Sequence, residues 1–435
     1  MYFDDLKKAI SNKTAKLGVI GLGYVGLPLA VEMAKSGFNV YGFDVQQKKV
    51  DLVNAGHNYI GDVVDKDLKD LAASGKLKAF SDFSKLQECD CVSICVPTPL
   101  DAYQQPDISY VKASAGEVAR YAHKGMLVVL ESTTYPGTTE EVIQPLLEER
   151  GLKVGEDIFL AFSPERVDPG NKQYKTKNTP KVVGGVTRKC TALASLLYSS
   201  FLEGGVYEVS SPKVAEMEKI LENTFRNINI ALANEMAILC NRMNIPVWEV
   251  IDAAKSKPYG FMAFYPGPGL GGHCIPLDPF YLTWKAREYN YHTRLIECAG
   301  EINNAMPEYI VERVSRILNR DKKPLNGSTV LLLGAAYKPD IDDLRESPVL
   351  KIITLFENAG ANVIVNDPYI PTFKHNGKEY KSAELTAELL RSCDIAVVTT
   401  NHSCYDPKFI AENAKRVFDT RNLMAGIDAD NVELL

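Results

Sequence analysis

Residues 16–44 contain the pattern that most restricts how this chain can fold: an apolar run, a glycine-rich turn, an amphipathic segment, a second apolar run and an acid. Gly21, Gly23 and Gly26 are spaced as GxGxxG directly after the first run. In a strand–turn–helix unit, the first glycine permits a tight turn, the second lets a pyrophosphate approach the helix N-terminus, and the third lets helix and strand pack closely. The pattern predicts a Rossmann-type dinucleotide-binding fold, with a glycine-rich turn that holds no ligand as the alternative.

Asp44 ends the second apolar run. A carboxylate at this position can accept hydrogen bonds from both ribose hydroxyls, and it would repel a 2′-phosphate. The sequence therefore favours NAD over NADP as the cofactor. We expect Tyr24 and Val25, which lie inside the glycine turn, to contact the same ligand.

Three further apolar runs, at 90–96, 126–131 and 157–162, are each followed by a polar cluster. Nearly continuous apolar runs are typical of parallel strands that are buried on both faces. Ligands of a doubly wound sheet bind at the carboxyl ends of its strands, so these clusters are candidate cofactor and substrate contacts. The residues expected there are Pro97 and Thr98, then Ser132 and Thr133, then Glu165 and Arg166.

A second copy of the pattern begins near residue 328, with a strand at 329–333, a helix over 347–359 and further strands at 362–367, 393–399 and 416–419. Its turn after Gly334 lacks the full GxGxxG spacing. We interpret it as a second nucleotide-type fold for a different ligand, with a purely structural α/β domain as the alternative. The predicted architecture is two Rossmann-like doubly wound domains, 1–211 and 319–435, joined by a helical domain over 212–318.

The helical domain contains two long helices, predicted over 213–241 and 293–317, the second interrupted by Pro307. Lys219 and Asn223 are four residues apart and so share one face of the first helix, which Arg226 extends. Asparagine is a poor helix former, so these residues indicate either a binding site or a solvated polar face. Helices of this length often pair two subunits, which predicts a homodimer or a higher homo-oligomer.

Residues 266–279 crowd four glycines and three prolines around Cys274. Proline removes backbone donors and glycine removes side-chain packing, so the segment must form turns. A thiol held in such turns is a candidate nucleophile, and the alternative is a small apolar side chain packed under the turn.

The overall composition excludes several classes of protein. The net charge of −6 argues against a nucleic-acid surface, and the sequence has neither an apolar signal core nor a membrane-length apolar run. The nine cysteines form no CxxC pair and the six histidines no metal-spaced cluster, so we expect a cytoplasmic protein without disulfides or a metal site.

Taken together, the motifs resemble the UDP-glucose/GDP-mannose dehydrogenases, the nucleotide-sugar 6-dehydrogenases. The likeness extends from Leu17 to about Leu423, and its motifs, in order, are Gly-Leu-Gly-Tyr-Val-Gly-Leu-Pro, Val-Pro-Thr-Pro at 96–99, Glu-Ser-Thr at 131–133, Ser-Pro-Glu at 163–165, Lys219…Asn223, Gly-Gly-His-Cys-Ile-Pro-Leu-Asp at 271–278, Tyr-Lys-Pro-Asp at 337–340 and Leu-Arg-Glu-Ser at 344–347. The resemblance implies an NAD-binding fold, a helical dimer core and a UDP-binding fold.

The resemblance also implies a four-electron oxidation at C6 of the sugar, in which Cys274 forms a thiohemiacetal and then a thioester. By position in the motifs, Lys219 and Asn223 would stabilise the oxyanion, Thr133 and Asp278 would position a water, and Glu165 would activate water for hydrolysis. The same comparison assigns nucleotide or sugar contacts to another group of residues: Arg345 to the cofactor or substrate, and Gly271, Lys338, Arg421 and Arg226 to the substrate.

Two departures bear on the substrate. Pro169-Gly170 stands where enzymes acting on UDP-glucose have a second glutamate, and His273 precedes the nucleophile in place of a small serine. Both features, with Arg166, resemble the branch that oxidises UDP-N-acetylhexosamines. We expect UDP-N-acetylglucosamine, with UDP-N-acetylmannosamine or UDP-glucose as alternatives, for surface polysaccharide synthesis. His273 could equally have a structural role, and a nucleotide-sugar-binding protein without turnover is the alternative from another class.

Overall fold

The computed structural model describes residues 2–101, 103–168, 170–171, 173–272 and 274–435. His273 and Pro169, on which part of the substrate interpretation depends, lie outside the described residues. The chain divides into two compact units: the first runs to Glu222 and adds Phe280–Asn290, and the second comprises Asn223–Pro279 and Tyr291–Leu435. The expected boundaries after residues 211 and 318 stay predictions.

The first unit is built on an eight-stranded sheet in the order β3-β2-β1-β4-β5-β6-β7-β8. Its strands are β1 (Lys16–Ile20), β2 (Asn39–Phe43), β3 (Leu77–Phe80), β4 (Cys91–Ile94), β5 (Leu127–Leu130), β6 (Phe159–Phe162), β7 (Lys181–Gly185) and β8 (Val206–Val209). All neighbours are parallel except the antiparallel pair of β6 and β7. The five strands predicted in this half are confirmed.

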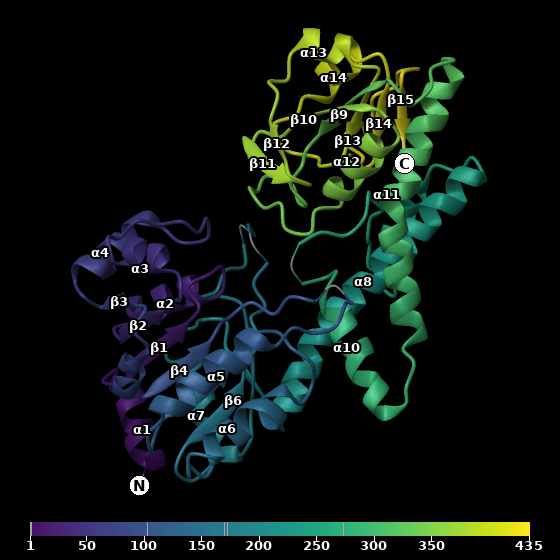
Figure 1. The fold of residues 1–435 in the computed structure, drawn as a ribbon. Helices are drawn as coiled ribbons and strands as arrows, with labels where there is room; N and C mark the ends of the chain where they lie inside the picture. Colours follow the sequence, from purple (N-terminus) through teal and green to yellow (C-terminus); the bar gives the residue numbers. More distant parts are fainter. Residues whose placement is uncertain (1, 102, 169, 172, 273) are drawn as a thin grey trace. The chain divides into compact units, whose positions relative to one another are not determined.

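Helices flank this sheet, and Figure 1 shows them in purple to blue. They are α1 (Tyr2–Ser11), α2 (Gly26–Lys35), α3 (Gln47–Asn54), α4 (Asp65–Ala73), α5 (Ser109–Tyr121), α6 (Gln144–Glu148) and α7 (Arg188–Ser199), with a 3₁₀ turn at Phe83–Glu88 and a π-helical turn at Thr139–Ile143. The sheet switches direction between β1 and β4, because β2 and β4 lie on opposite sides of β1. In such sheets the ligand crevice lies at this switch point, outside the carboxyl ends of the strands.

The long helices match the predicted periodicity. They are α8 (Pro212–Arg242), which passes from the first unit to the second, and α11 (Arg294–Arg320), which continues through Pro307. The shorter ones are α9 (Val247–Lys255) and α10 (Asp278–Ala286), the latter followed by a 3₁₀ turn at Arg287–Tyr289.

The second unit contains a smaller parallel sheet in the order β10-β9-β13-β14-β15, seen side by side in Figure 1. Its strands are β9 (Thr329–Leu333), β10 (Asn362–Asn366), β13 (Ile395–Val398), β14 (Val417–Asp419) and β15 (Val432–Leu434), with a separate hairpin of β11 (Thr372–His375) and β12 (Lys378–Lys381). The flanking helices are α12 (Pro348–Asn358), α13 (Ala387–Ser392) and α14 (Pro407–Asn413). The second Rossmann-like fold is therefore confirmed, although the hairpin and β15 were not predicted.

Both faces of this sheet are buried, which explains its nearly continuous apolar strands. Along β9, Val330 and Leu332 join one apolar core, whereas Leu331 and Leu333 join the other. Successive side chains of a strand point to opposite faces, so a strand covered on both sides needs apolar residues at every position.

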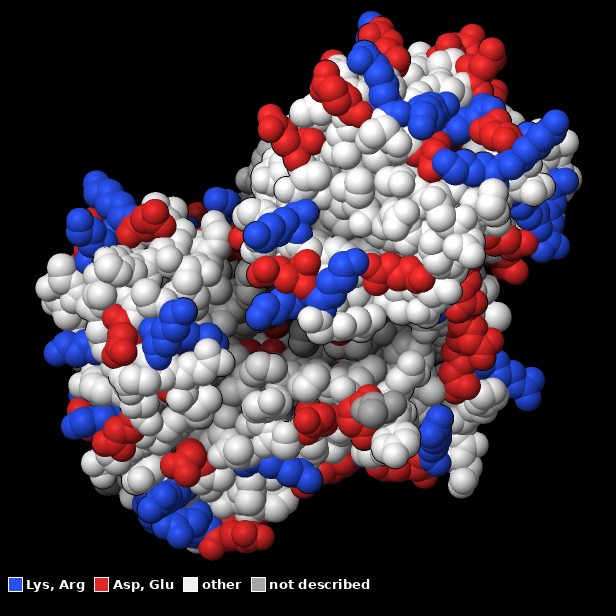
Figure 2. Space-filling model, turned by 45° about the horizontal axis from the view of Figure 1, so that its top comes forward, with Lys and Arg blue, Asp and Glu red and all other residues white. Residues whose placement is uncertain are grey.

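None of the described helices is both long enough and apolar enough to cross a membrane. On the face drawn in Figure 2, basic and acidic side chains are interspersed, as the small net charge of −6 suggests.

Candidate active site

The glycine turn of the first sheet connects β1 to α2. Gly21 has a φ of 90°, and a Cβ there would lie 2.4 Å from the carbonyl oxygen of Cys95, so a side chain is excluded. A Cβ on Gly26 would lie 1.9 Å from the carbonyl oxygen of Gly21, which shows how closely the helix and the turn pack. Gly23 differs, because a Cβ there would meet no atom within 4 Å. Its backbone faces open space at the N-terminus of α2, where a pyrophosphate fits.

Asp44 lies directly after β2 and is only 6% exposed. Its Oδ2 accepts a hydrogen bond from the backbone N–H of Leu22 at 3.0 Å and lies 3.2 Å from Nζ of Lys49. Its Oδ1 accepts from the N–H of Gln46 at 2.9 Å. These contacts fix the carboxylate beside the glycine turn, where a ribose acceptor is required.

The polar clusters after β4 and β5 lie at the same edge of the sheet. Ser132 joins them, because its Oγ accepts from the N–H of Val96 at 2.9 Å and donates to the carbonyl oxygen of Val96 at 2.8 Å. Thr98 is buried, Pro97 is exposed and Thr133 is partly exposed. This edge therefore offers exposed groups on a backbone that buried hydrogen bonds hold in place.

Glu165 and Arg166 follow β6. Oε1 of Glu165 accepts from the backbone N–H groups of Arg166 at 2.8 Å and Val167 at 2.9 Å. The Arg166 guanidinium pairs with two carboxylates of α8: Nη2 lies against Oε1 of Glu222 and 3.5 Å from Oε1 of Glu218. Burial raises the pKa of Glu218, and the adjacent Glu222 raises it further. Arg166 is thus held against α8 in the first unit.

Two further charged residues, which the sequence interpretation missed, lie behind Glu165. Nζ of Lys181 lies 2.5 Å from Oε2 of Glu131 and 3.3 Å from Oε2 of Glu165. The Tyr198 hydroxyl donates to Oε1 of Glu131 at 2.6 Å. The available signal was a charge at one end of an otherwise apolar run, since a buried charge requires a partner.

Helix α8 carries Lys219 and Asn223 one turn apart, 7% and 4% exposed. The side-chain amide of Asn223 donates to Oδ2 of Asp278 at 2.5 Å, so the structure brings two of the predicted catalytic residues together. Arg226, predicted to bind substrate, is exposed on the same helix.

Cys274 is partly exposed in the glycine–proline segment. Its carbonyl oxygen accepts from the N–H groups of Leu277 at 3.1 Å and Asp278 at 2.9 Å. The thiol-bearing residue therefore begins the turn that leads into α10. The prediction that this segment forms turns is confirmed.

A chain of buried asparagines ties this segment to α8 and α11. Asn234 accepts from the N–H of Gly267 and donates to Oδ1 of Asn303, both at 2.9 Å. Asn303 donates to the carbonyl oxygen of Asn227 at 3.1 Å, and Asn227 donates to the carbonyl oxygen of Ile275 at 3.2 Å. All three asparagines are 2% exposed or less. The segment is thus anchored on both sides of Cys274.

The glycines of this segment pack against the second Rossmann-like fold, within the second unit. A Cβ on Gly267 would lie 2.5 Å from Nη1 of Arg421, and the N–H of Gly272 donates to the carbonyl oxygen of Arg345 at 3.0 Å. A Cβ on Gly271 would also overlap this fold, at 2.4 Å from a tyrosine side chain. The glycines permit this close approach, so the loop of Cys274 adjoins two arginines predicted to bind ligand.

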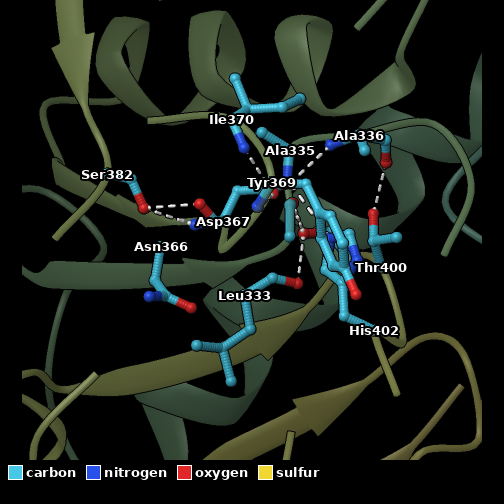
Figure 3. Close-up of polar contacts among 12 residues, drawn as sticks. Leu333, Ala335, Ala336, Asn366, Asp367, Tyr369, Ile370, Ser382, Thr400 and His402 are labelled. Carbon is cyan, nitrogen blue, oxygen red and sulfur yellow. Dashed lines mark hydrogen bonds and ion pairs between the residues drawn. The ribbon is translucent and has the colours of Figure 1, made fainter. Parts of the chain in front are cut away.

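The crevice of the second fold differs from that of the first (Figure 3). Asp367 ends β10, as Asp44 ends β2, but its Oδ2 accepts from the N–H groups of Ala335 at 2.7 Å and Ala336 at 2.8 Å and lies 3.1 Å from Nε2 of His402. Protein groups therefore surround this carboxylate where a dinucleotide fold would present it to a ribose.

The predicted residues fall into two sets. Those of the first unit are Gly21, Gly23, Tyr24, Val25, Gly26, Asp44, Pro97, Thr98, Ser132, Thr133, Glu165, Arg166 and Lys219; those of the second are Asn223, Arg226, Gly271, Cys274, Asp278, Lys338, Arg345 and Arg421. Lys338 is partly exposed in the loop after β9. That the two sets act at one carbon stays a prediction.

The fold and the first crevice define a class: a two-Rossmann-fold protein with a dinucleotide-type glycine turn. Comparison with known proteins narrows that class. Family models of the UDP-glucose/GDP-mannose dehydrogenases match over 15–202 (NAD binding domain), 213–305 (central domain) and 331–426 (UDP binding domain). The chain belongs to the UDP-glucose/GDP-mannose dehydrogenase family. It is an NAD-dependent nucleotide-sugar dehydrogenase whose substrate is a UDP-sugar.

Individual relatives agree over most of the chain. A UDP-N-acetyl-D-glucosamine 6-dehydrogenase of Pseudomonas aeruginosa is 38% identical, covering 82% of this chain and 84% of the relative. A UDP-N-acetyl-D-mannosamine dehydrogenase of Pyrococcus horikoshii is 35% identical, covering 96% of both chains. The solved structure of the UDP-D-ManNAc dehydrogenase from Pyrococcus horikoshii superposes with a TM-score of 0.87 at 33% identity, covering 96% of this chain and 98% of that chain.

Proposed function

We propose that the protein oxidises the C6 alcohol of UDP-N-acetylglucosamine to the carboxylate through a thioester on Cys274, for surface polysaccharide synthesis. The observation that carries the chemistry is the anchored segment of Cys274, which the asparagine chain ties to α8 and which shares the Asn223–Asp278 hydrogen bond. The substrate assignment draws on the relatives named UDP-N-acetyl-D-glucosamine 6-dehydrogenase, at 38% and 35% identity. UDP-N-acetylmannosamine is the second candidate, because relatives named for it are 35% identical.

NAD, when bound, supplies the acceptor for each hydride. The glycine turn would hold its pyrophosphate at Gly23, and Asp44 would accept from the ribose hydroxyls. The fit is supported by the open space at Gly23 and by the fixed carboxylate of Asp44. Tyr24, Val25 and the residues at the ends of β4 and β5 would line the same crevice.

Lys219 and Asn223 would stabilise the oxyanion of the alcohol as it loses its first hydride and its O–H proton to become an aldehyde. The Cys274 thiolate then forms a C–S bond to the aldehyde carbon, and the carbonyl electron pair moves to oxygen, which is protonated to give a thiohemiacetal. Loss of a second hydride and the O–H proton gives the thioester.

Water then adds to the thioester, the C–S bond breaks, and the Cys274 thiolate leaves as the carboxylate forms. Glu165 would take the proton of that water, and Thr133 and Asp278 would position the water that relays protons. Lys338, Arg345 and Arg421 would bind the nucleotide part. The overall balance is one UDP-sugar alcohol, two NAD⁺ and one water to one acid and two NADH.

The NADH yield tests this function. Purified protein with limiting UDP-N-acetylglucosamine should form two NADH per sugar, and parallel assays with UDP-N-acetylmannosamine and UDP-glucose should show lower kcat/KM. The Cys274→Ala variant should still bind NAD but form no acid. Normal acid yield from that variant would remove the thioester mechanism, and no absorbance change with any UDP-sugar would remove the dehydrogenase function.

We also propose that two chains associate through α8. Phe225, Leu232 and Leu239 are spaced by seven residues on this helix and are 46%, 55% and 46% exposed. Apolar residues at heptad spacing are typical of a helix that packs against another helix, and a second copy offers the same seam. Light scattering should give twice the chain mass, and Leu232→Glu should give the single-chain mass; a monomeric native protein would contradict the proposal. The expected cytoplasmic location remains a prediction.

A further inference from the structure

Three neighbouring strands of the first sheet bring three charged side chains together below its carboxyl edge. Glu131 follows β5, Glu165 follows β6 and Lys181 begins β7. Their side chains are 0%, 15% and 5% exposed. The Lys181 ammonium lies between the carboxylates, 2.5 Å from Glu131 and 3.3 Å from Glu165, and also donates to the carbonyl oxygen of Pro164 at 3.3 Å.

Fold stability alone does not account for this arrangement. Buried ion pairs lose so much solvation that well-packed apolar residues of similar volume are often equally stable or more so. Here, two carboxylates share one ammonium, which leaves a net negative charge in a buried site. Glu131 has no route to a ligand that the mechanism uses, whereas Glu165 has one. The arrangement therefore suggests a role for the ammonium at Glu165.

Every oxygen of Glu165 is engaged in a way that favours its charged form. Oε1 accepts two backbone N–H groups and Oε2 accepts from Lys181. Burial alone would raise the pKa of Glu165, but the charge of Lys181 and the two N–H groups together lower it. The titratable and charged groups that surround it are Lys181 on β7, Glu131 after β5, Cys95 after β4, Tyr198 on α7 and Arg166 in its own loop.

Glu131 explains why Lys181 stays charged. Burial alone would lower the pKa of Lys181, but Glu131 and then Glu165 raise it overall. The Tyr198 hydroxyl, donating at 2.6 Å, holds Glu131 on its other side. The four side chains thus form a chain of contacts that ends on Glu165.

We propose that Lys181, held by Glu131, is a positioning residue that keeps Glu165 in its carboxylate form and fixed in the loop after β6. Its value for water activation depends on the proposed function of Glu165. Without Lys181, Glu165 would keep its burial and the repulsion of Glu131 but lose its cation. The carboxyl would then stay protonated to a higher pH and could not accept a proton from water below that pH.

The test is Lys181→Met, with titration of the apo protein by NMR after labelling the glutamate carboxyl carbons. Glu165→Gln in the same background assigns the signal. We expect the ionisation midpoint of Glu165 to rise by about one pH unit or more, the usual effect of losing a close opposite charge. Lys181→Arg should restore the native midpoint, because it keeps the charge.

Two further variants separate this role from a loss of stability. Glu131→Gln with Lys181→Met removes both charges of the inner pair, and should recover stability while Glu165 still titrates high. Lys285→Met is the matched control: Lys285 is also 5% exposed and paired with two glutamates, Glu141 and Glu288, both at 2.7 Å. That variant should leave the Glu165 midpoint unchanged.

Mass spectrometry supplies the second readout. Lys181→Met should accumulate the sugar–nucleotide adduct on Cys274 at about pH 6 and clear it at about pH 8, whereas the native enzyme clears it at both. An unchanged Glu165 midpoint in Lys181→Met would overturn the proposal. A raised midpoint with rapid acid release by Glu165→Gln would instead uphold the role of Lys181 and remove Glu165 from the proposed function.

Discussion

The asparagine chain behind Cys274 yields a prediction whose size follows from the structure. Asn234→Ala removes two buried hydrogen bonds and leaves the Gly267 N–H and Oδ1 of Asn303 without these partners. An unsatisfied buried polar group costs about 1–3 kcal/mol, so the two together cost about 2–6 kcal/mol. Alanine recovers about 0.6 kcal/mol through its helix propensity. The net loss in local stability should therefore be about 2–5 kcal/mol.

Hydrogen–deuterium exchange measures this loss where it occurs. Opening of the segment around Gly267 should become easier by the same free energy, and each 1.4 kcal/mol is about a factor of ten in an equilibrium. The peptide containing Gly267 should therefore exchange at least about 30-fold faster in Asn234→Ala than in the native protein. The exchange experiment needs no two-state assumption, which a chain of two compact units need not satisfy.

A control lies on the same helix. Asn229 donates to the carbonyl oxygen of Phe225 at 2.7 Å in an exposed setting, so Asn229→Ala leaves no buried group unsatisfied. It should change the exchange of the Gly267 peptide by less than threefold. Native exchange rates in Asn234→Ala, or equal acceleration in both variants, would refute the reasoning that the asparagine chain anchors the segment of Cys274.

Gly26→Ala should lower the stability of the apo protein by about 1–3 kcal/mol in urea unfolding, because its Cβ would overlap the Gly21 carbonyl oxygen, whereas Gly23→Ala should weaken only NAD affinity in calorimetry. Equal stability of the two variants would contradict this. Glu218→Gln should flatten the fall in stability as pH rises above the ordinary carboxyl pKa, because the raised pKa of Glu218 means that the folded chain binds the proton more tightly than the unfolded chain; an unaltered pH profile would exclude it. Arg166→Ala should lower kcat/KM for UDP-N-acetylglucosamine more than for UDP-glucose, and equal losses would remove its proposed specificity role.

The two nucleotide-type folds were predictable because their signals are local. A GxGxxG turn between an apolar run and an amphipathic segment reports a backbone conformation that only glycine allows, as the φ of 90° at Gly21 confirms. The residues before and after each parallel strand were predictable for the same reason. The hairpin of β11 and β12 was not, because short exposed strands carry little periodicity.

The sequence alone determined the fold class, the family, the NAD turn and the thiol in its glycine–proline segment, because each depends on the chemistry of adjacent residues. Only the tertiary structure decided which polar side chains support them. Lys181 meets Glu131 and Glu165, and Asn234 meets Gly267, across long separations in the chain. Such contacts arise when strands and helices pack, and a buried charge or amide then needs a partner that no spacing in the sequence specifies.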